Sequence, residues 1–300
     1  MRKGIDHVIL TRFNLPSVGV ESLVRAQEGW LRTRVALFEK YCVPSVLGQT
    51  SSNFRWLIYL DPESPEWLRG LVADYERAGT FVPIYRESVS PSELLDDIRA
   101  LTGAGGSTLI TSNLDNDDAL AVDFVQRLQD TAPAVPRAAL YFSHGLIKSP
   151  AGLYFRTDRH NAFCSVRETW EAPDTCWVDW HDRLPRRMPV QLIGGEPGWL
   201  QVVHGTNVSN RVRGSLTSPD RYRTLFPTLL DDVPPPRAAD ITRDRLVAAP
   251  LRVTRESARS LVKHVAIALL GKSGFDSAKG ALARARRSAA RDQPSSTSGR

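Results

Sequence analysis

The sequence has few cysteines and no long apolar run. Its 300 residues include three cysteines, Cys42, Cys164 and Cys176, and no two of them form a CxxC pair. An odd number of cysteines without an apolar leader segment predicts a reducing compartment rather than a disulfide framework. No stretch reaches the roughly 18 to 20 consecutive apolar residues that a transmembrane helix needs. We therefore expect a cytoplasmic protein that is soluble or peripheral at the inner face of the plasma membrane.

Two nucleotide-binding signatures and a calcium loop are also missing. No GxxxxGK[ST] sequence occurs, and the glycine-rich segment 103–106 precedes a predicted strand instead of joining a strand to a helix. These facts exclude a P-loop and disfavour a dinucleotide-binding fold. An EF-hand loop beginning at Asp115 needs an oxygen ligand and then a glycine where this chain has Ala119 and Leu120.

The sequence does have an ordinary globular composition and an uneven charge. Hydrophobic residues make up 42% of the chain, which suffices for a sizeable core at this length. Residues 1–236 hold 25 Lys and Arg against 28 Asp and Glu, a net charge of −3. Residues 237–300 hold 14 against 5, a net charge of +9, and the two parts give the overall +6. We expect a mildly acidic body and a basic tail.

Short apolar runs alternate with helical patterns over the first 130 residues, as is typical of parallel βαβ units. Strands are predicted at 6–11, 54–61, 80–86 and 107–112, with helices over 30–41, 67–79 and 90–101 between them. This order predicts an α/β fold, a mixed and mostly parallel sheet flanked by helices, with ligands beyond the carboxyl ends of its strands. The pattern then changes to two β-like runs, 138–149 and 151–168, with small turn residues between them, which favours antiparallel hairpins. A strand is predicted at 199–210 and a flexible segment at 211–218.

The run Pro234–Pro236 marks a boundary. We expect an α/β domain over 1–236, a basic amphipathic helical appendage over 237–287 and a disordered tail over 288–300. A basic amphipathic helix suits either a peripheral contact with an anionic membrane or a solvated cover on the domain. Nucleic acid is not an expected partner, because Phe275 is the only aromatic residue of the tail.

Three carboxylates, Asp115, Asp117 and Asp118, gather directly after the fourth predicted strand. Carboxylates this close raise one another's pKa unless a cation or strong donors offset the repulsion. Mg²⁺ or Mn²⁺ suits such a site, since Mg²⁺ commonly takes one or two carboxylates together with substrate phosphates. The alternative is structural: Asp118 stands where a helix N-cap belongs before Ala119, and the other acids favour the positive end of that helix.

Four segments together resemble a known family. They read HVILTRFN from His7, LFEKYCVPSVLGQTSSNFRWLIYLD from Leu37, SNLDNDDAL from Ser112 and VVHGTNVSN from Val202. In this order they resemble the bacterial rhamnosyl transferases, a group similar to the GT-A fold, over residues 6–209. The resemblance implies a GT-A-like, Rossmann-like glycosyltransferase domain over 1–236, a nucleotide-sugar donor, and a divalent ion that bridges the donor's diphosphate.

The resemblance also implies roles at the donor site. Thr11, Arg12 and Asn14 lie where related enzymes hold the nucleoside. Asp61 matches their base-contacting acid, and Asp115 is expected to contact the ribose.

Two of these residues have structural alternatives. Asp61 can open the turn at Pro62 as an Asx residue. Arg12 can bind a phosphate with its planar guanidinium, or it can pair with a surface acid such as Glu39.

For the metal, the resemblance implies Asp117 and His204 as ligands, with Asp118 as a third ligand or as the helix cap. A structural role is the alternative for His204, because a single His near a turn is more often structural. Arg211 and Arg213 follow in a loop that can close over the diphosphate and supply charge against the leaving group.

Sugar transfer with inversion needs one base that takes the proton of the acceptor hydroxyl. The segment CWVDWHDRL offers carboxylates between two tryptophans, Trp177 and Trp180, and aromatic rings suit the apolar face of a pyranose. We predict Asp182 as the base, with Asp179 second. Tryptophans in a core hairpin are the alternative reading of this segment.

The sequence thus predicts a metal-dependent glycosyltransferase whose acceptor is a glycan or a lipid-linked component of the cell envelope. The family resemblance points to rhamnose as the sugar. A metal-dependent nucleotidyl or phosphoryl transferase shares the Asp cluster and stays open. A non-catalytic carbohydrate-binding protein, whose acids only cap a helix, is the alternative outside enzymes.

Overall fold

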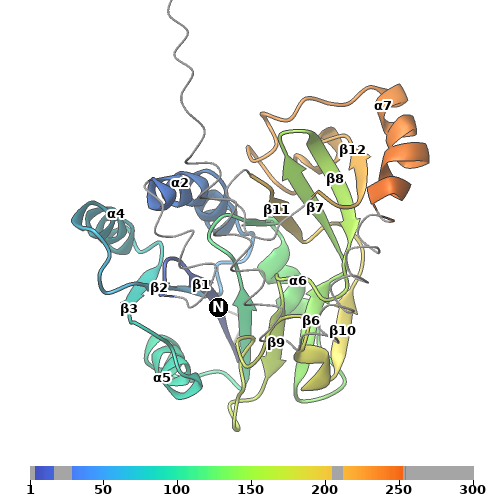
Figure 1. Cartoon of the computed structure of the whole chain (residues 1–300). Coiled ribbons are helices and arrows are strands. Elements are labelled where there is room, and N and C mark those ends of the chain that lie inside the picture. Colours follow the sequence, from blue (N-terminus) through green and yellow to red (C-terminus); the bar gives the residue numbers. More distant parts are fainter. Residues whose placement is uncertain (1–3, 17–28, 205–211, 253, 255–300) are drawn as a thin grey trace, which may run out of the picture.

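Two β-sheets and the helices packed around them make up the computed structural model, which describes residues 4–16, 29–204, 212–252 and 254 (Figure 1). The larger sheet has seven strands in the order β10-β6-β9-β4-β1-β2-β3. Its strands are β1 (Ile5–Arg12), β2 (Arg55–Leu60), β3 (Val82–Tyr85), β4 (Thr108–Asn113), β6 (Ala138–Phe142), β9 (Ser165–Glu168) and β10 (Val190–Ile193).

The predicted mixed, mostly parallel sheet is confirmed. Strand β1 pairs in parallel with both β2 and β4, and β2 pairs in parallel with β3. Strand β9 runs antiparallel to β4 and β6 and supplies the mixed part. The strands are apolar runs because both faces of the sheet are covered; Val8, Ile9 and Leu10 in succession are fully buried.

The second sheet has five strands in the order β12-β8-β7-β11-β5. They are β5 (Ala119–Leu120), β7 (His144–Ser149), β8 (Gly152–Thr157), β11 (Trp199–Val202) and β12 (Ser215–Thr217). The antiparallel pairing predicted for the two runs is confirmed by β7 and β8. The run 138–149 is not one strand, however, because it contains both β6 and β7, which belong to different sheets. The segment 211–218 is likewise not simply flexible, since Ser215–Thr217 pairs with β8.

The helices that flank the larger sheet are α2 (Trp30–Leu37), α3 (Val43–Leu47), α4 (Glu66–Arg77), α5 (Pro91–Thr102) and α6 (Phe124–Asp130). A π-helical turn, η1 (Phe38–Cys42), joins α2 directly to α3. Pro44 explains this turn, because a proline has no N–H to donate to the carbonyl of Lys40 four residues earlier.

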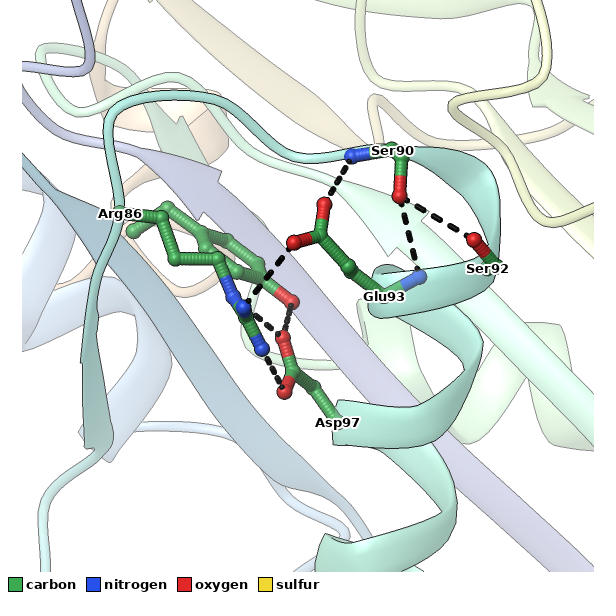
Figure 2. A network of polar contacts seen from close by, with 6 residues as sticks. Arg86, Ser90, Ser92, Glu93 and Asp97 are labelled. Atoms are coloured by element: carbon green, nitrogen blue, oxygen red, sulfur yellow. Dashed lines mark hydrogen bonds and ion pairs between the residues drawn. The ribbon is translucent and has the colours of Figure 1, made fainter.

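Helix α5 is fixed to the carboxyl end of β3 by a polar network (Figure 2). Ser90 and Glu93 form a reciprocal capping box, in which the Ser90 hydroxyl accepts from the Glu93 amide and the Glu93 carboxylate accepts from the Ser90 amide. Arg86 donates to Asp97 over 2.6 Å, and the Tyr59 hydroxyl donates to the same carboxylate over 3.0 Å. The network therefore ties β2, β3 and α5 together.

The chain after β12 packs on the second sheet. Tyr222, which ends the 3₁₀ turn η3 (Asp220–Tyr222), and Phe226 are buried with Leu146 in one core cluster. Helix α7 (Ala238–Arg243) continues into a π-helical segment, η4 (Asp244–Ala248). There Asp244 accepts from the Leu216 amide over 2.8 Å, which attaches this segment to β12.

Of the predicted appendage and tail, residues 253 and 255–300 lie outside the described residues. The domain boundaries at 236 and 287 therefore stay predictions. Within the described residues, no helix is long and apolar enough to cross a membrane.

Candidate functional site

The carboxyl ends of β1, β2 and β4 meet at one edge of the larger sheet. Arg12 ends β1, Asp61 directly follows β2, and Asn113 ends β4 just before the acid cluster. This convergence follows from the parallel pairing, which places the same ends of neighbouring strands side by side. Most of the predicted donor-site residues are brought together by it.

The predicted helix cap at Asp118 is wrong. Ala119 and Leu120 form β5 by pairing with Leu200 and Trp199, and helix α6 begins only at Phe124. Asp118 is fully buried, and its Oδ1 accepts from the backbone amide of Val202 over 2.8 Å. Its Oδ2 has no hydrogen-bond partner within the described part of the chain. Asp118 thus anchors β11 beside the acid cluster.

Asp117 is the centre of a buried charged group. The Nε2 atom of His204 lies 2.9 Å from Asp117 Oδ2, and Nη1 of Arg34 forms an ion pair with the same oxygen. The side chains of Arg34, Asp117 and His204 are only 12%, 7% and 15% exposed, so solvent screens these contacts little. Asn116 completes the group: it accepts from Arg34 over 3.3 Å and donates to the carbonyl of Phe13.

Arg34 was not predicted from the sequence. It lies in helix α2, and the segments that the family resemblance uses begin after it, at Leu37, or lie before it. An arginine in a helix with other basic residues has no local mark of function, so only the tertiary contact with Asp117 identifies it.

The three acids have different proton affinities because their surroundings differ. Burial by itself raises the pKa of Asp117, but the hydrogen bond with His204 and the charge of Arg34 outweigh it and lower the pKa. Burial, and then the charges of Asp117 and Asp115, raise the pKa of Asp118 well above its ordinary value. Desolvation of the carboxylate, and then the charge of Asp117, raise the pKa of Asp115 as well, but less than that of Asp118.

At the β1–β2 end, Asn14 holds the turn that carries Asp61. The Asn14 Oδ1 atom accepts from the Asp61 amide over 3.0 Å, and its Nδ2 atom donates to Ser64 Oγ over 3.0 Å. Asp61 Oδ1 accepts from the Glu63 amide over 2.7 Å, which is the predicted Asx turn. Thr11 is fully buried and its hydroxyl accepts from the Trp56 indole over 3.0 Å, so it supports the strand from inside.

The segment after Cys176 lies beside this edge. The guanidinium carbon of Arg12 is 4.1 Å from the centre of the Trp177 ring, which is a cation–π contact. The Trp177 indole donates to Asn113 Oδ1 over 2.7 Å, and Asn113 Nδ2 donates to Asp115 over 3.3 Å. These contacts join Arg12, Trp177 and the first acid of the cluster.

The two candidate bases differ in their surroundings. Asp179 accepts from its neighbouring Trp180 amide over 2.8 Å and from Arg187 over 3.4 Å, and these contacts lower its pKa. Asp182 is exposed, and no hydrogen bond or ion pair reaches its carboxylate from the described residues. Trp180 is 66% exposed, so its ring is available to a ligand.

The structure describes only one of the two predicted arginines that follow His204. Arg211 lies outside the described residues. Arg213 is partly buried in the segment that leads into β12. Their roles over the diphosphate stay predictions.

The side chains at Asp117 fit a partial set of ligands for a divalent ion. Two donors each about 2.1 Å from an octahedral ion lie about 3 Å apart, and the His204 nitrogen and the Asp117 oxygen are 2.9 Å apart. The predicted role of Asp118 as a third ligand stays a prediction. The described residues contain no group of three or more His, Cys, Asp or Glu side chains placed to hold a metal. Any ion here would need oxygens from a substrate or from water.

Comparison with solved structures gives distant neighbours. The chain resembles TarS of S. aureus at 9% identity and a TM-score of 0.37, covering 67% of this chain and 37% of TarS. It resembles TarS 1–349 of S. aureus in complex with UDP at 11% identity and a TM-score of 0.34, and the similarity covers 78% of this chain and 68% of the TarS chain. A third neighbour is a "putative nucleotide-diphospho-sugar transferase" from Desulfovibrio desulfuricans G20, at 11% identity and a TM-score of 0.34. The similarity covers 66% of this chain and 81% of that transferase. No curated protein sequence matches the chain.

A sequence profile gives the family. The profile described as "Putative rhamnosyl transferase" matches residues 6–216, more than two thirds of the chain. The match includes β1, the acid cluster and His204, and therefore the whole group of contacts around Asp117. The chain thus belongs to the family of putative rhamnosyl transferases.

Proposed function

We propose that the chain transfers a sugar, rhamnose by the family's description, from a nucleotide donor to a hydroxyl of a glycan or a lipid-linked cell-envelope acceptor, with inversion and with a divalent ion. The observation that supports this best is the buried Asp117 carboxylate, which contacts both Arg34 and His204 at the carboxyl edge of the sheet. Charged groups with shifted pKa values and little solvent exposure are typical of sites that bind and act on charged substrates.

The nucleoside is assigned to the β1–β2 side of the edge. Asp61 accepts a hydrogen bond from an N–H of the base, and Asn14 holds Asp61 in place through the backbone amide of that residue. Asp115, which is exposed next to Arg12 and Trp177, accepts from the ribose hydroxyls. Arg12, whose guanidinium lies over the Trp177 ring, is assigned to a phosphate, which its planar guanidinium suits.

The diphosphate is assigned to the Asp117 side. Asp117 and His204 would hold Mg²⁺ or Mn²⁺, which when bound neutralises charge that develops on the leaving diphosphate. Arg34 contacts the Asp117 oxygen that such an ion needs, so Arg34 either moves aside or shares this oxygen when the ion binds. Asp118 is a positioning residue, because its bond to Val202 fixes β11 two residues before His204. Arg213, with Arg211, supplies further positive charge from the following loop.

In the transfer step, the acceptor oxygen forms a bond to the anomeric carbon while the bond from that carbon to the diphosphate oxygen breaks. The electron pair of the broken bond leaves with the diphosphate. The acceptor hydroxyl gives its proton to a carboxylate, for which Asp182 is the first choice. Asp179 is second, since the contacts that lower its pKa also make it a weaker base. The exposed Trp180 ring covers the apolar face of a sugar.

A peripheral contact with an anionic membrane belongs to the same proposal. Leu246, Val247 and Leu251 are 73%, 52% and 50% exposed in the helical segment after α7, next to several arginines. Exposed apolar side chains flanked by cations suit the interface of a membrane, where each Lys or Arg near anionic lipid contributes on the order of 1 kcal/mol.

Isothermal titration with uridine, thymidine and guanosine diphosphates, each in Mn²⁺ and in chelator, tests the proposal. We expect one of the three to bind in Mn²⁺ and to bind more weakly in chelator. Asp117→Asn should lose this dependence on Mn²⁺, whereas the control Asp96→Asn, at an exposed carboxylate of α5, should keep it. Equal binding in chelator would remove the metal from the proposal, and binding of none of the nucleotides would remove the donor.

A further inference from the structure

A cavity of about 560 Å³ has His204 in its lining. Its walls come from the β7–β8 hairpin, from the helical turn at Tyr41, from the end of β11 and from the segment Pro234–Pro236. The volume falls within the range of about 300–1,000 Å³ that small-molecule sites occupy. Because His204 both lines the cavity and contacts Asp117, the cavity adjoins the proposed diphosphate site.

The polar side chains of this cavity are held in fixed positions. Lys148 is nearly buried, and its Nζ donates to the Leu229 carbonyl over 2.7 Å and to Asp232. Asp232 also accepts from Lys40 over 2.9 Å. The Lys148 ammonium lies 4.7 Å from the centre of the Tyr41 ring. A rigid arrangement of this kind can select a ligand, because the groups are oriented before it arrives.

The charges around the cavity are balanced. Its lining holds two cations, Lys148 and Arg237, and two carboxylates, Asp232 and Asp240. The hydrogen bonds from both lysines outweigh burial and lower the pKa of Asp232, which keeps this carboxylate ionised beside Lys148. A polyanionic ligand would meet the two carboxylates of this lining, Asp232 and Asp240. The rest of the lining is mainly apolar, with Leu37, Leu153, Leu216 and the prolines among its members.

We propose that this cavity is the acceptor subsite and that it binds an uncharged sugar unit of the acceptor glycan. A neutral sugar matches both features of the lining, because its hydroxyls can donate to Asp232 and Asp240 and its C–H faces can pack on the leucines and prolines. This inference rests on the proposed function. It extends that function, because it states that the sugar unit of the acceptor that binds next to His204 is uncharged.

The test uses saturation-transfer NMR on the full chain with methyl glycosides as probes: glucoside, galactoside, mannoside and rhamnoside, and the anionic glucuronide. We expect at least one neutral glycoside to receive saturation from the protein and the glucuronide to receive less. Ala151→Trp, at an exposed position of the cavity wall, should abolish the signal, and Pro235→Trp, at another exposed position of the lining, should do the same. The control Ala134→Trp, exposed in a bend outside the cavity, should keep it.

Three results would overturn the acceptor subsite: no neutral glycoside saturated by the wild type, a stronger signal for the glucuronide, or an unchanged signal in both tryptophan variants. Circular dichroism and titration with the nucleotide diphosphates report separately on folding and on the donor site. If the wild type bound a neutral glycoside but none of the nucleotide diphosphates, this would count against the proposed donor site alone. If the wild type bound a nucleotide diphosphate but no neutral glycoside, this would count against the acceptor subsite alone.

Discussion

Replacement of Arg34 by methionine is the sharpest test of the buried charged group. Arg34→Met keeps an apolar stem in helix α2 but removes the cation that contacts Asp117. Removal of one partner from a buried ion pair costs about 3 to 5 kcal/mol, since the other charge is left without compensation. The side chains of Arg34 and Asp117 are only 12% and 7% exposed, so solvent screens the pair little. In the variant, however, His204 still contacts the Asp117 carboxylate. We therefore expect the lower end, about 3 kcal/mol of unfolding free energy at pH 7.

Urea unfolding followed by far-UV circular dichroism measures this loss. With a slope of about 3 kcal/mol per molar urea, the midpoint should fall by about 1 M. The matched control is Arg77→Met. The side chains of Arg77 and its partner Asp74 are 77% and 65% exposed, so this ion pair should contribute less than about 1 kcal/mol. If Arg34→Met lowered the midpoint no more than this control, the reasoning that the Asp117 group is desolvated and paired would be refuted.

Three further predictions concern other parts of the chain. Burial, and then the charge of Arg167, lower the pKa of His7 to about 3, so the unfolded chain binds a proton below pH 6.5 that the folded chain does not. Stability should be full above pH 6.5 and fall by about 1.4 kcal/mol per pH unit below it, and urea midpoints of His7→Gln should show a flatter decline between pH 6.5 and 4 than the wild type. Asp182→Asn should keep nucleotide affinity in titration calorimetry and lose sugar transfer, and full turnover would reject Asp182 as the base. The double variant Leu246→Asp and Val247→Asp should sediment less with phosphatidylglycerol vesicles than the wild type; equal partition would count against the membrane contact.

The alternation of strands and helices in the first half of the chain could be predicted because it depends on local patterns. Apolar runs of strand length mark β1, β2 and β4, and the Ser90–Glu93 pair marks the start of α5. The parallel arrangement then places the strand ends, and with them Arg12, Asp61 and the acids, at one edge. This part of the candidate site therefore followed from the sequence and one topological rule.

The assignment of strands to sheets could not be predicted in the same way. Within residues 138–149 only the short segment 143–145 separates two apolar runs, yet β6 pairs with β9 and β10 while β7 pairs with β8 and β11. Periodicity reports that a residue is buried but not which strand lies beside it. The same limit explains β5, where pairing with β11 replaced a predicted helix start.

By itself the sequence determined the acid cluster after β4, the edge at which it lies and the family to which the chain belongs. Only the tertiary structure decided the partners of those acids: Arg34 and His204 at Asp117, and the Val202 amide at Asp118. These partners are more than 80 residues away from the acids along the chain. No local preference encodes such contacts, because they arise when separately formed elements pack and the buried charges must find compensation.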